Sequence, residues 1–197
     1  MIKKLLYGVY ALFFNISRAL LPIKENRVVF VSMHNENFND SLGAVCREVE
    51  KKKAFETVYI TRRDLDVKLS NVFRVLGFFL VKSRLLATAK YVFLNDNFMP
   101  LAKLNFRSEA VITQLWHAEG VFKKFGLAIE QEESLRKNEI ECNKKLTYVV
   151  CSSKALVPYY AEAFGVSEKN VLPLGAPRAD YLLNEGNAQK AKEKLCG

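Results

Sequence analysis

The sequence predicts an α/β domain built on a parallel β-sheet. Short runs rich in Val, Ile, Phe and Tyr alternate along the chain with segments of helical length. The runs are nearly continuously apolar, which is typical of strands that are covered on both faces. Strand, helix and strand in repetition imply parallel pairing through right-handed crossovers. A chain of 197 residues is long enough for one such domain with a proper core.

The predicted strands come in six segments after Pro22. Each is short, rich in β-branched or aromatic residues and bounded by polar or turn-forming residues. They are Val28–Ser32, Thr57–Thr61, Tyr91–Asn95, Val111–Trp116, Tyr148–Cys151 and Val171–Leu174.

Helix-length segments separate these strands. Gly165 is well placed to end the last of them, and Ser153 could cap its start. The predicted helices are Ser41–Lys53, Val72–Thr88, Glu130–Asn143 and Lys154–Phe164.

The amino-terminal segment predicts an amphipathic helix at a membrane surface. Its apolar run, Leu5–Phe14, is too short to cross a hydrocarbon core that needs about 20 residues. Lys3, Lys4 and Arg18 supply positive charge, and aromatic residues stand beside the apolar stripe, as an in-plane helix requires. The stripe has helical spacing and consists of Ile2, Leu5, Leu6, Val9, Phe13, Ile16 and Leu20, with Tyr7, Tyr10 and Phe14 beside it.

Two other interpretations of this segment stay open. A signal peptide would show the same basic start and short apolar centre, but no small-x-small cleavage site precedes Pro22. The helix could also dock on the surface of its own domain.

Composition favours an anionic partner without choosing it. The formal charge is +9 and the pI is near 9.4, which suits nucleic acid, a phosphate-rich polymer or an acidic membrane face. The four cysteines show no C-x-x-C spacing and only two histidines could join them, so we predict no metal site, no cofactor and reduced thiols. No dinucleotide or P-loop motif is present.

The densest candidate site is Q-L-W-H-A-E-G-V-F-K-K-F-G, from Gln114 to Gly126. A strand delivers His117 to its carboxyl end, where ligands bind in parallel sheets. Histidine titrates near neutrality and could accept a proton from an attacking hydroxyl. Gly120 would let backbone approach a ligand, and Lys123 and Lys124 could face phosphates. A histidine bonded to its neighbours beside a solvated lysine pair is the structural alternative.

Two other loops follow strands of the predicted sheet. After the first strand, Asn35 and Asn37 suit a loop that hydrogen-bonds its own backbone or a polyol. After the last strand comes L-G-A-P-R-A-D, in which Gly175 and Pro177 shape a turn, and Arg178 and Asp180 could pair or bind a charged ligand. A structured turn and a rigid linker are the plain interpretations of the two.

The motifs together resemble a known family. A-K-Y-V-F-L-N-D-N at Ala89–Asn97, then Q-L-W-H with the trailing K-K-F-G, then G-A-P-R-A-D, are similar in order and spacing to the CDP-glycerol glycerophosphotransferases. These are the primases and polymerases of teichoic acids. The resemblance covers about Val28 to Leu183, and the combination of motifs is more specific than any one of them.

The resemblance implies the architecture called GT-B, in which two Rossmann-like domains enclose the active site. This chain would be the amino-terminal, acceptor-side domain, and the other domain would bind the donor, CDP-glycerol. His117 matches the family's histidine and would be the base for the hydroxyl of a lipid-linked polyol-phosphate acceptor. Lys123, Lys124, Gly120, Asn35 and Asn37 would then bind acceptor or phosphate, and the interdomain turn would comprise Gly175, Pro177, Arg178 and Asp180.

The sequence departs from the family pattern in two respects. Ala118-Glu119-Gly120 replaces Gly-Thr-Pro, and the step to the lysine pair is one residue longer. The chain also stops where the family's second domain should begin. We therefore expect a helix over 1–22, a Rossmann-like domain over 23–183 and a polar tail over 184–197, and an incomplete enzyme.

Three interpretations of function remain. The first is the acceptor half of a glycerophosphotransferase, peripheral to the cytoplasmic face of a bacterial cell membrane and bound to anionic lipid. The second is a membrane-associated acceptor-binding module without catalysis. The third is a basic nucleic-acid-binding α/β domain, but no RNP, KH or helix-turn-helix signature supports a nucleic-acid partner.

Overall fold

The computed structural model describes residues 2–33, 38, 40–65, 75–180, 186–187 and 192–193. These residues form a six-stranded, all-parallel sheet in the order β2-β1-β3-β4-β5-β6. All six predicted strands are present, as β1 (Lys24–Ser32), β2 (Glu56–Thr61), β3 (Ala89–Leu94), β4 (Val111–Gln114), β5 (Tyr148–Cys151) and β6 (Val171–Pro173).

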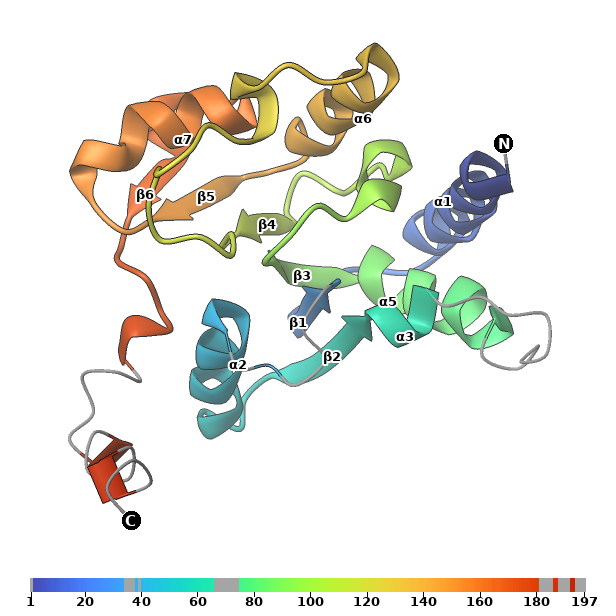
Figure 1. The fold of residues 1–197 in the computed structure, drawn as a ribbon. Helices are drawn as coiled ribbons and strands as arrows, with labels where there is room; N and C mark the ends of the chain where they lie inside the picture. Colours follow the sequence, from blue (N-terminus) through green and yellow to red (C-terminus); the bar gives the residue numbers. More distant parts are fainter. Residues whose placement is uncertain are drawn as a thin grey trace.

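Helices cover both faces of this sheet, as predicted (Figure 1). On one face, α2 (Ser41–Lys51) packs through Leu42 and Cys46 against Val28 and Phe30 of β1. The larger core lies on the other face, and α1 (Ile2–Leu20), α5 (Ser83–Ala87), α6 (Glu133–Asn143) and α7 (Val157–Phe164) contribute to it.

Short turns complete the connections. The segment before α5 is a π-helix, η2 (Gly77–Lys82), and 3₁₀ turns occur at η3 (Met99–Lys103), η4 (Gly126–Ala128), η5 (Lys154–Leu156) and η6 (Glu168–Asn170). The single-turn helix α3 (Arg62–Leu65) follows β2. Gly165 ends α7 with φ 61°, as predicted. Ser153 precedes the 3₁₀ turn η5 and makes no side-chain cap hydrogen bond.

The orientation of α1 corrects part of the sequence interpretation. The helix docks on the domain through Tyr10, Ala11 and Phe14, which are buried, and the Tyr10 ring stacks on Phe78 at 4.5 Å. Two of the aromatic residues expected at a membrane boundary therefore belong to the core. This face of α1 therefore docks on its own domain, since burying these rings against the sheet outweighs leaving them at the surface.

An apolar stripe nevertheless remains exposed on α1. Positions four or seven apart fall on one helical face, and on that face the structure exposes Leu5, Leu12, Ile16 and Leu20, with exposed fractions of 69%, 57%, 45% and 76%. We call these four residues the α1 stripe. Leu6, Val9 and Phe13 of the predicted stripe instead pack partly against the core. Among the described residues, no helix has the length and hydropathy needed to cross a bilayer.

Candidate functional site

His117 lies just beyond the carboxyl end of β4, and its side chain is exposed to solvent. Its neighbour Trp116 is buried, and the two rings pack with their centroids 4.1 Å apart. Trp116 adopts φ 58°, a left-handed conformation that is uncommon for a bulky residue. This turn separates a ring that packs into the core from a ring that faces solvent.

A buried glutamine holds the turn. The Gln114 side chain accepts a hydrogen bond from the backbone N–H of Trp116 at 3.0 Å and donates one to the backbone carbonyl of Asp96 at 3.3 Å. The first bond satisfies an N–H that has left the strand ladder, and the second ties β4 to the loop after β3. The strand end that carries His117 is therefore fixed on both sides.

Two hydrogen bonds and one close backbone approach fix the loop that follows His117. The Tyr160 hydroxyl of α7 donates to the carbonyl of Ala118 at 2.7 Å, and the Ser152 hydroxyl donates to the carbonyl of Glu119 at 2.6 Å. Gly126 has φ 57°, and a Cβ there would lie 2.3 Å from the carbonyl oxygen of Ala163. A glycine is thus required where the loop approaches α7.

The site borders the point where the strand order reverses, between β1 and β3. The chain runs from β1 outward to β2, then crosses to β3 on the other side of β1. Asn95 follows β3 and donates from its side chain to the carboxylate of Asp40, which caps α2 by accepting from the N–H of Gly43 at 3.1 Å. His117 forms a hydrogen bond with the Asn95 backbone. Open parallel sheets bind ligands at such a point.

The electrostatic setting keeps the imidazole neutral. Desolvation is the largest influence and lowers the pKa of His117, because Trp116 covers one face of the ring. The hydrogen bond with Asn95 raises the pKa and opposes this effect, while the positive charges of Arg178 and Lys123 lower it further. A neutral imidazole can accept a proton, which is what a general base must do.

The turn after β6 reaches this site, as expected for neighbouring strand ends. Gly175 adopts φ 98°, and its N–H donates to the carbonyl of Cys151 at 3.2 Å. The guanidinium of Arg178 donates to the carboxylate of Glu119, three residues beyond Trp116 in the His117 loop. The pairing of Arg178 with Asp180 considered from the sequence is thus replaced by one with Glu119, which lies closer in the fold.

The remaining predicted residues fall into three groups. Lys123 and Lys124 are exposed, and Gly120 lies in the same loop, where a Cβ would approach the Phe122 ring to 3.1 Å. Pro177 and Asp180 line a cavity of about 730 Å³ beside α2. Asn35 and Asn37, like His34, lie outside the described residues, as does most of the 184–197 tail.

Sequence reasoning missed Asn95, Asp40 and Gln114 as site residues. Asn95 is 3% exposed, and its Oδ1 has no partner among the described residues. The polar triplet N-D-N directly after an apolar strand was the available signal. What it could not reveal is that β3 neighbours both β1 and β4, which brings Asn95 between Asp40 and His117.

Comparison with known proteins agrees with this architecture. The chain is 30% identical over 188 residues to the teichoic acid ribitol-phosphate primase of Bacillus spizizenii, covering 93% of this chain and 48% of that protein. It is 29% identical to the ribitol-phosphate polymerase TarK of Staphylococcus aureus, over 92% of this chain and 35% of that protein. The chain thus spans about half, or less, of the length of these relatives.

Solved structures confirm the Rossmann-like fold. The domain superimposes on a structure of the wall teichoic acid polymerase TagF with a TM-score of 0.74 and 16% identity, over 98% of this chain and 50% of that chain. The family pattern described as CDP-glycerol:poly(glycerophosphate) glycerophosphotransferase matches residues 12–196. The chain therefore belongs to this family of teichoic acid polyol-phosphate transferases.

Proposed function

We propose that this chain provides the acceptor side of a polyol-phosphate transfer, with His117 as the general base. The observation that carries the proposal is an exposed, neutral imidazole at the carboxyl end of β4, beside the β1/β3 switch point of the sheet. The acceptor hydroxyl would give its proton to the imidazole, and its oxygen would form a bond to the β-phosphorus of CDP-glycerol. The bond from that phosphorus to the bridging oxygen breaks, and CMP leaves with the electron pair.

The cations around His117 suit a phosphate-rich acceptor. Lys123 and Lys124 extend into solvent from the same loop. We propose Gly120 of that loop as a point where the backbone approaches the phosphate. Arg178 is held by Glu119, so a phosphate entering the site would compete with that carboxylate for the guanidinium. We propose Asn35 and Asn37 as polyol-binding residues from their place after β1.

Donor binding is proposed to require a second half. The family's description names CDP-glycerol as donor, and the relatives are about twice as long as this chain or longer. We propose that residues 1–22 attach to the membrane, that 23–183 form the acceptor domain, and that 184–197 lead toward the donor half. The chain by itself is then inactive.

The decisive experiment measures CMP release with a lipid-linked acceptor. The purified chain alone should release none above background, and the chain combined with a complementing donor half should turn over. In that combination His117→Ala should lower turnover by roughly 10²–10⁴ while the fold is kept, and His34→Ala should cost much less. Near-normal turnover of the His117→Ala variant would contradict the role of His117 as general base. CMP release by the chain alone would contradict the requirement for a donor-binding half.

A second candidate is a membrane-associated acceptor-binding module without catalysis. The observation that favours it is the α1 stripe, which could lie in the surface of an anionic membrane on the cytoplasmic side. Such a module would bind acceptor equally well with His117→Ala and would gain no activity from a donor half. The same turnover assay therefore separates the two candidates.

A further inference from the structure

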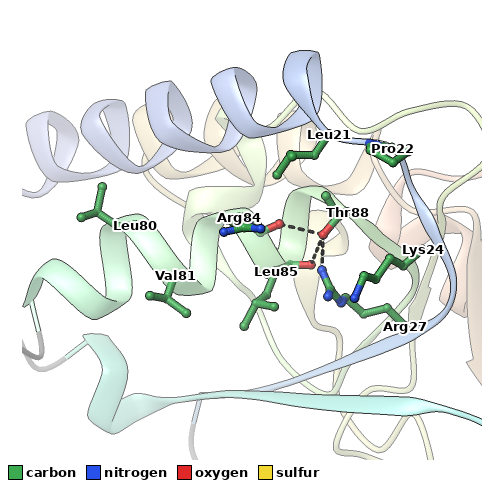
Figure 2. Close-up of a pocket in the computed structure, with 9 residues that line it drawn as sticks. All are labelled: Leu21, Pro22, Lys24, Arg27, Leu80, Val81, Arg84, Leu85 and Thr88. Carbon is green, nitrogen blue, oxygen red and sulfur yellow. Dashed lines mark hydrogen bonds between the residues drawn. The ribbon is translucent and has the colours of Figure 1, made fainter.

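A cavity of about 320 Å³ opens beside the end of α1, away from His117. It lies between the α1–β1 connection, η2 and α5, and nine residues line it (Figure 2). Its volume is at the low end of the roughly 300–1,000 Å³ range of small-molecule sites. Lys24 and Arg27 lie roughly 26 Å and 17 Å along β1 from its carboxyl end, the edge of the sheet that carries His117. The cavity is therefore separate from the transfer site.

Most of the cavity wall is hydrocarbon. Leu21 and Pro22 contribute from the chain that leaves α1, and Leu80, Val81 and Leu85 contribute from η2 and α5 (Figure 2). Leu80 and Val81 are 46% and 53% exposed, so the cavity is open to solvent at an apolar rim. Apolar walls open to water favour an apolar occupant.

Positive charge stands at one end of this apolar wall. Lys24, Arg27 and Arg84 line the cavity, and the nearby carboxylate is that of Glu56, which pairs with Lys24 at 3.3 Å and with Arg27 at 2.9 Å. Lys24 and Arg27 therefore share one carboxylate, which leaves the charge of Arg84 uncompensated among the described residues. The guanidinium of Arg84 has no hydrogen bond or ion pair within the described part of the chain.

Arg27 is a buried arginine of the cavity wall. Arg27 is 5% exposed, and its two terminal guanidinium nitrogens donate hydrogen bonds to the Thr88 hydroxyl and the Glu56 carboxylate. Its Nε has no partner among the described residues. The bonds to Thr88 and Glu56 fix the guanidinium at the cavity wall, where it adds to the positive charge.

We propose that this cavity binds one anionic amphiphile, with its acyl chain against Leu80, Val81 and Leu85 and its carboxylate or phosphate head toward Arg84 and Lys24. The α1 stripe ends at Leu20, directly before Leu21 of the cavity wall, so a membrane on that stripe would present lipid at the opening. The proposal goes beyond the transfer reaction, and it uses the proposed membrane attachment only as the source of the ligand.

Binding is tested with the full chain and dodecyl phosphate below its micelle concentration, followed by displacement of a dansyl-labelled undecanoate. Dodecyl phosphate should displace the probe at one site per chain. Dodecyl maltoside, with the same tail and no charge, should bind roughly ten- to a hundredfold more weakly, as expected for the loss of a charge-assisted contact. Inorganic phosphate should not displace it. Equal displacement by the maltoside, or none by either amphiphile, would overturn the proposal.

Two variants locate the ligand. Val81→Trp fills the cavity and Arg84→Glu reverses the charge at its head, and both alter exposed side chains. Each variant should lower the affinity for dodecyl phosphate at least tenfold. The control variants Ile129→Trp and Arg136→Glu, at exposed positions elsewhere, should bind it like the wild type. Unchanged binding by both cavity variants, with folding verified by circular dichroism, would contradict the assignment.

A third variant separates this proposal from membrane attachment. Leu12→Asp combined with Ile16→Asp changes the α1 stripe but no residue of the cavity. This variant should still bind dissolved dodecyl phosphate with wild-type affinity, whether or not it still binds lipid vesicles. Loss of dodecyl phosphate binding in this variant would show that the stripe, and not the cavity, holds the amphiphile.

Discussion

The side chain of Gln114 accepts a hydrogen bond from the backbone N–H of Trp116, two residues further on, at 3.0 Å. This contact spans the point at which β4 ends and the backbone turns to φ 58°. It connects a buried polar group, 2% exposed, to the geometry of the adjacent His117. Several expected outcomes depend on this contact and on its neighbours.

Replacing Gln114 with Met should destabilise the domain by about 1–3 kcal/mol, because the buried Trp116 N–H loses its acceptor while side-chain volume is kept. Urea unfolding followed by circular dichroism measures the change. Glu162→Met, at an exposed position on α7, is the control and should leave stability nearly unchanged. A decrease in the free energy of unfolding below about 0.5 kcal/mol, the usual range of surface substitutions, would contradict this role. The turn at Trp116 would then be stable without the Gln114 hydrogen bond.

Replacing Arg178 with Met should raise the pKa of His117, because a nearby positive charge that disfavours the imidazolium is removed. Nuclear magnetic resonance titration of the imidazole protons measures this, and His34→Gln assigns the signals, since the chain has two histidines. Arg136→Met, an exposed arginine on α6, should leave the titration unchanged. An unaltered pKa in the Arg178 variant would show that its charge does not reach the ring.

The lowered pKa of His117 also fixes the sign of its effect on stability. The unfolded chain binds a proton to this residue more readily than the folded chain does. Its contribution to the free energy of unfolding is therefore present above the ordinary histidine pKa of about 6.5 and is lost as pH falls from there through the folded pKa. His117→Gln should remove that part of the pH dependence, measured by urea unfolding between pH 5 and pH 8.

Replacing Leu12 and Ile16 with Asp should reduce sedimentation with anionic liposomes by roughly tenfold or more, because each exposed side chain loses its apolar contact with lipid. These positions are preferable to Leu6, Val9 and Phe13, whose packing against the core would confuse the result. Leu174→Asp, 73% exposed on another surface, is the control. Raising the salt should weaken the basic contribution and leave much of the apolar one. Equal sedimentation of all variants would make α1 a docked helix alone.

Replacing Glu56 with Gln should destabilise the domain at pH 7 and matter less at pH 3. The hydrogen bond from Arg27 lowers the pKa of Glu56, so its stabilisation is present above the unfolded value of about 4.3 and disappears as pH falls through the folded value. The difference between wild type and variant should therefore shrink on acidification. Glu162→Gln, an exposed glutamate on α7, should show no such trend. A difference that is constant with pH would contradict the role of the pair.

The sequence alone determined the order of the strands along the chain and their parallel pairing. Each strand is a run of apolar residues of the right length, and each connection is long enough for a crossover, so local patterns carry this information. The motif containing His117 was placed at a strand end by the same reasoning. The docked face of α1 was not predictable, because apolar side chains surround most of that helix and helical periodicity does not rank them.

The tertiary structure decided which side chains meet at the site. Asn95, Asp40 and His117 come together because β3 lies between β1 and β4, and no local pattern in the sequence specifies that order. Arg178 meets Glu119 rather than Asp180 because β4, β5 and β6 are successive neighbours in the sheet. Such contacts join residues up to about 60 positions apart. They depend on packing the whole sheet, whereas a strand or a helix depends on its own residues and their immediate neighbours.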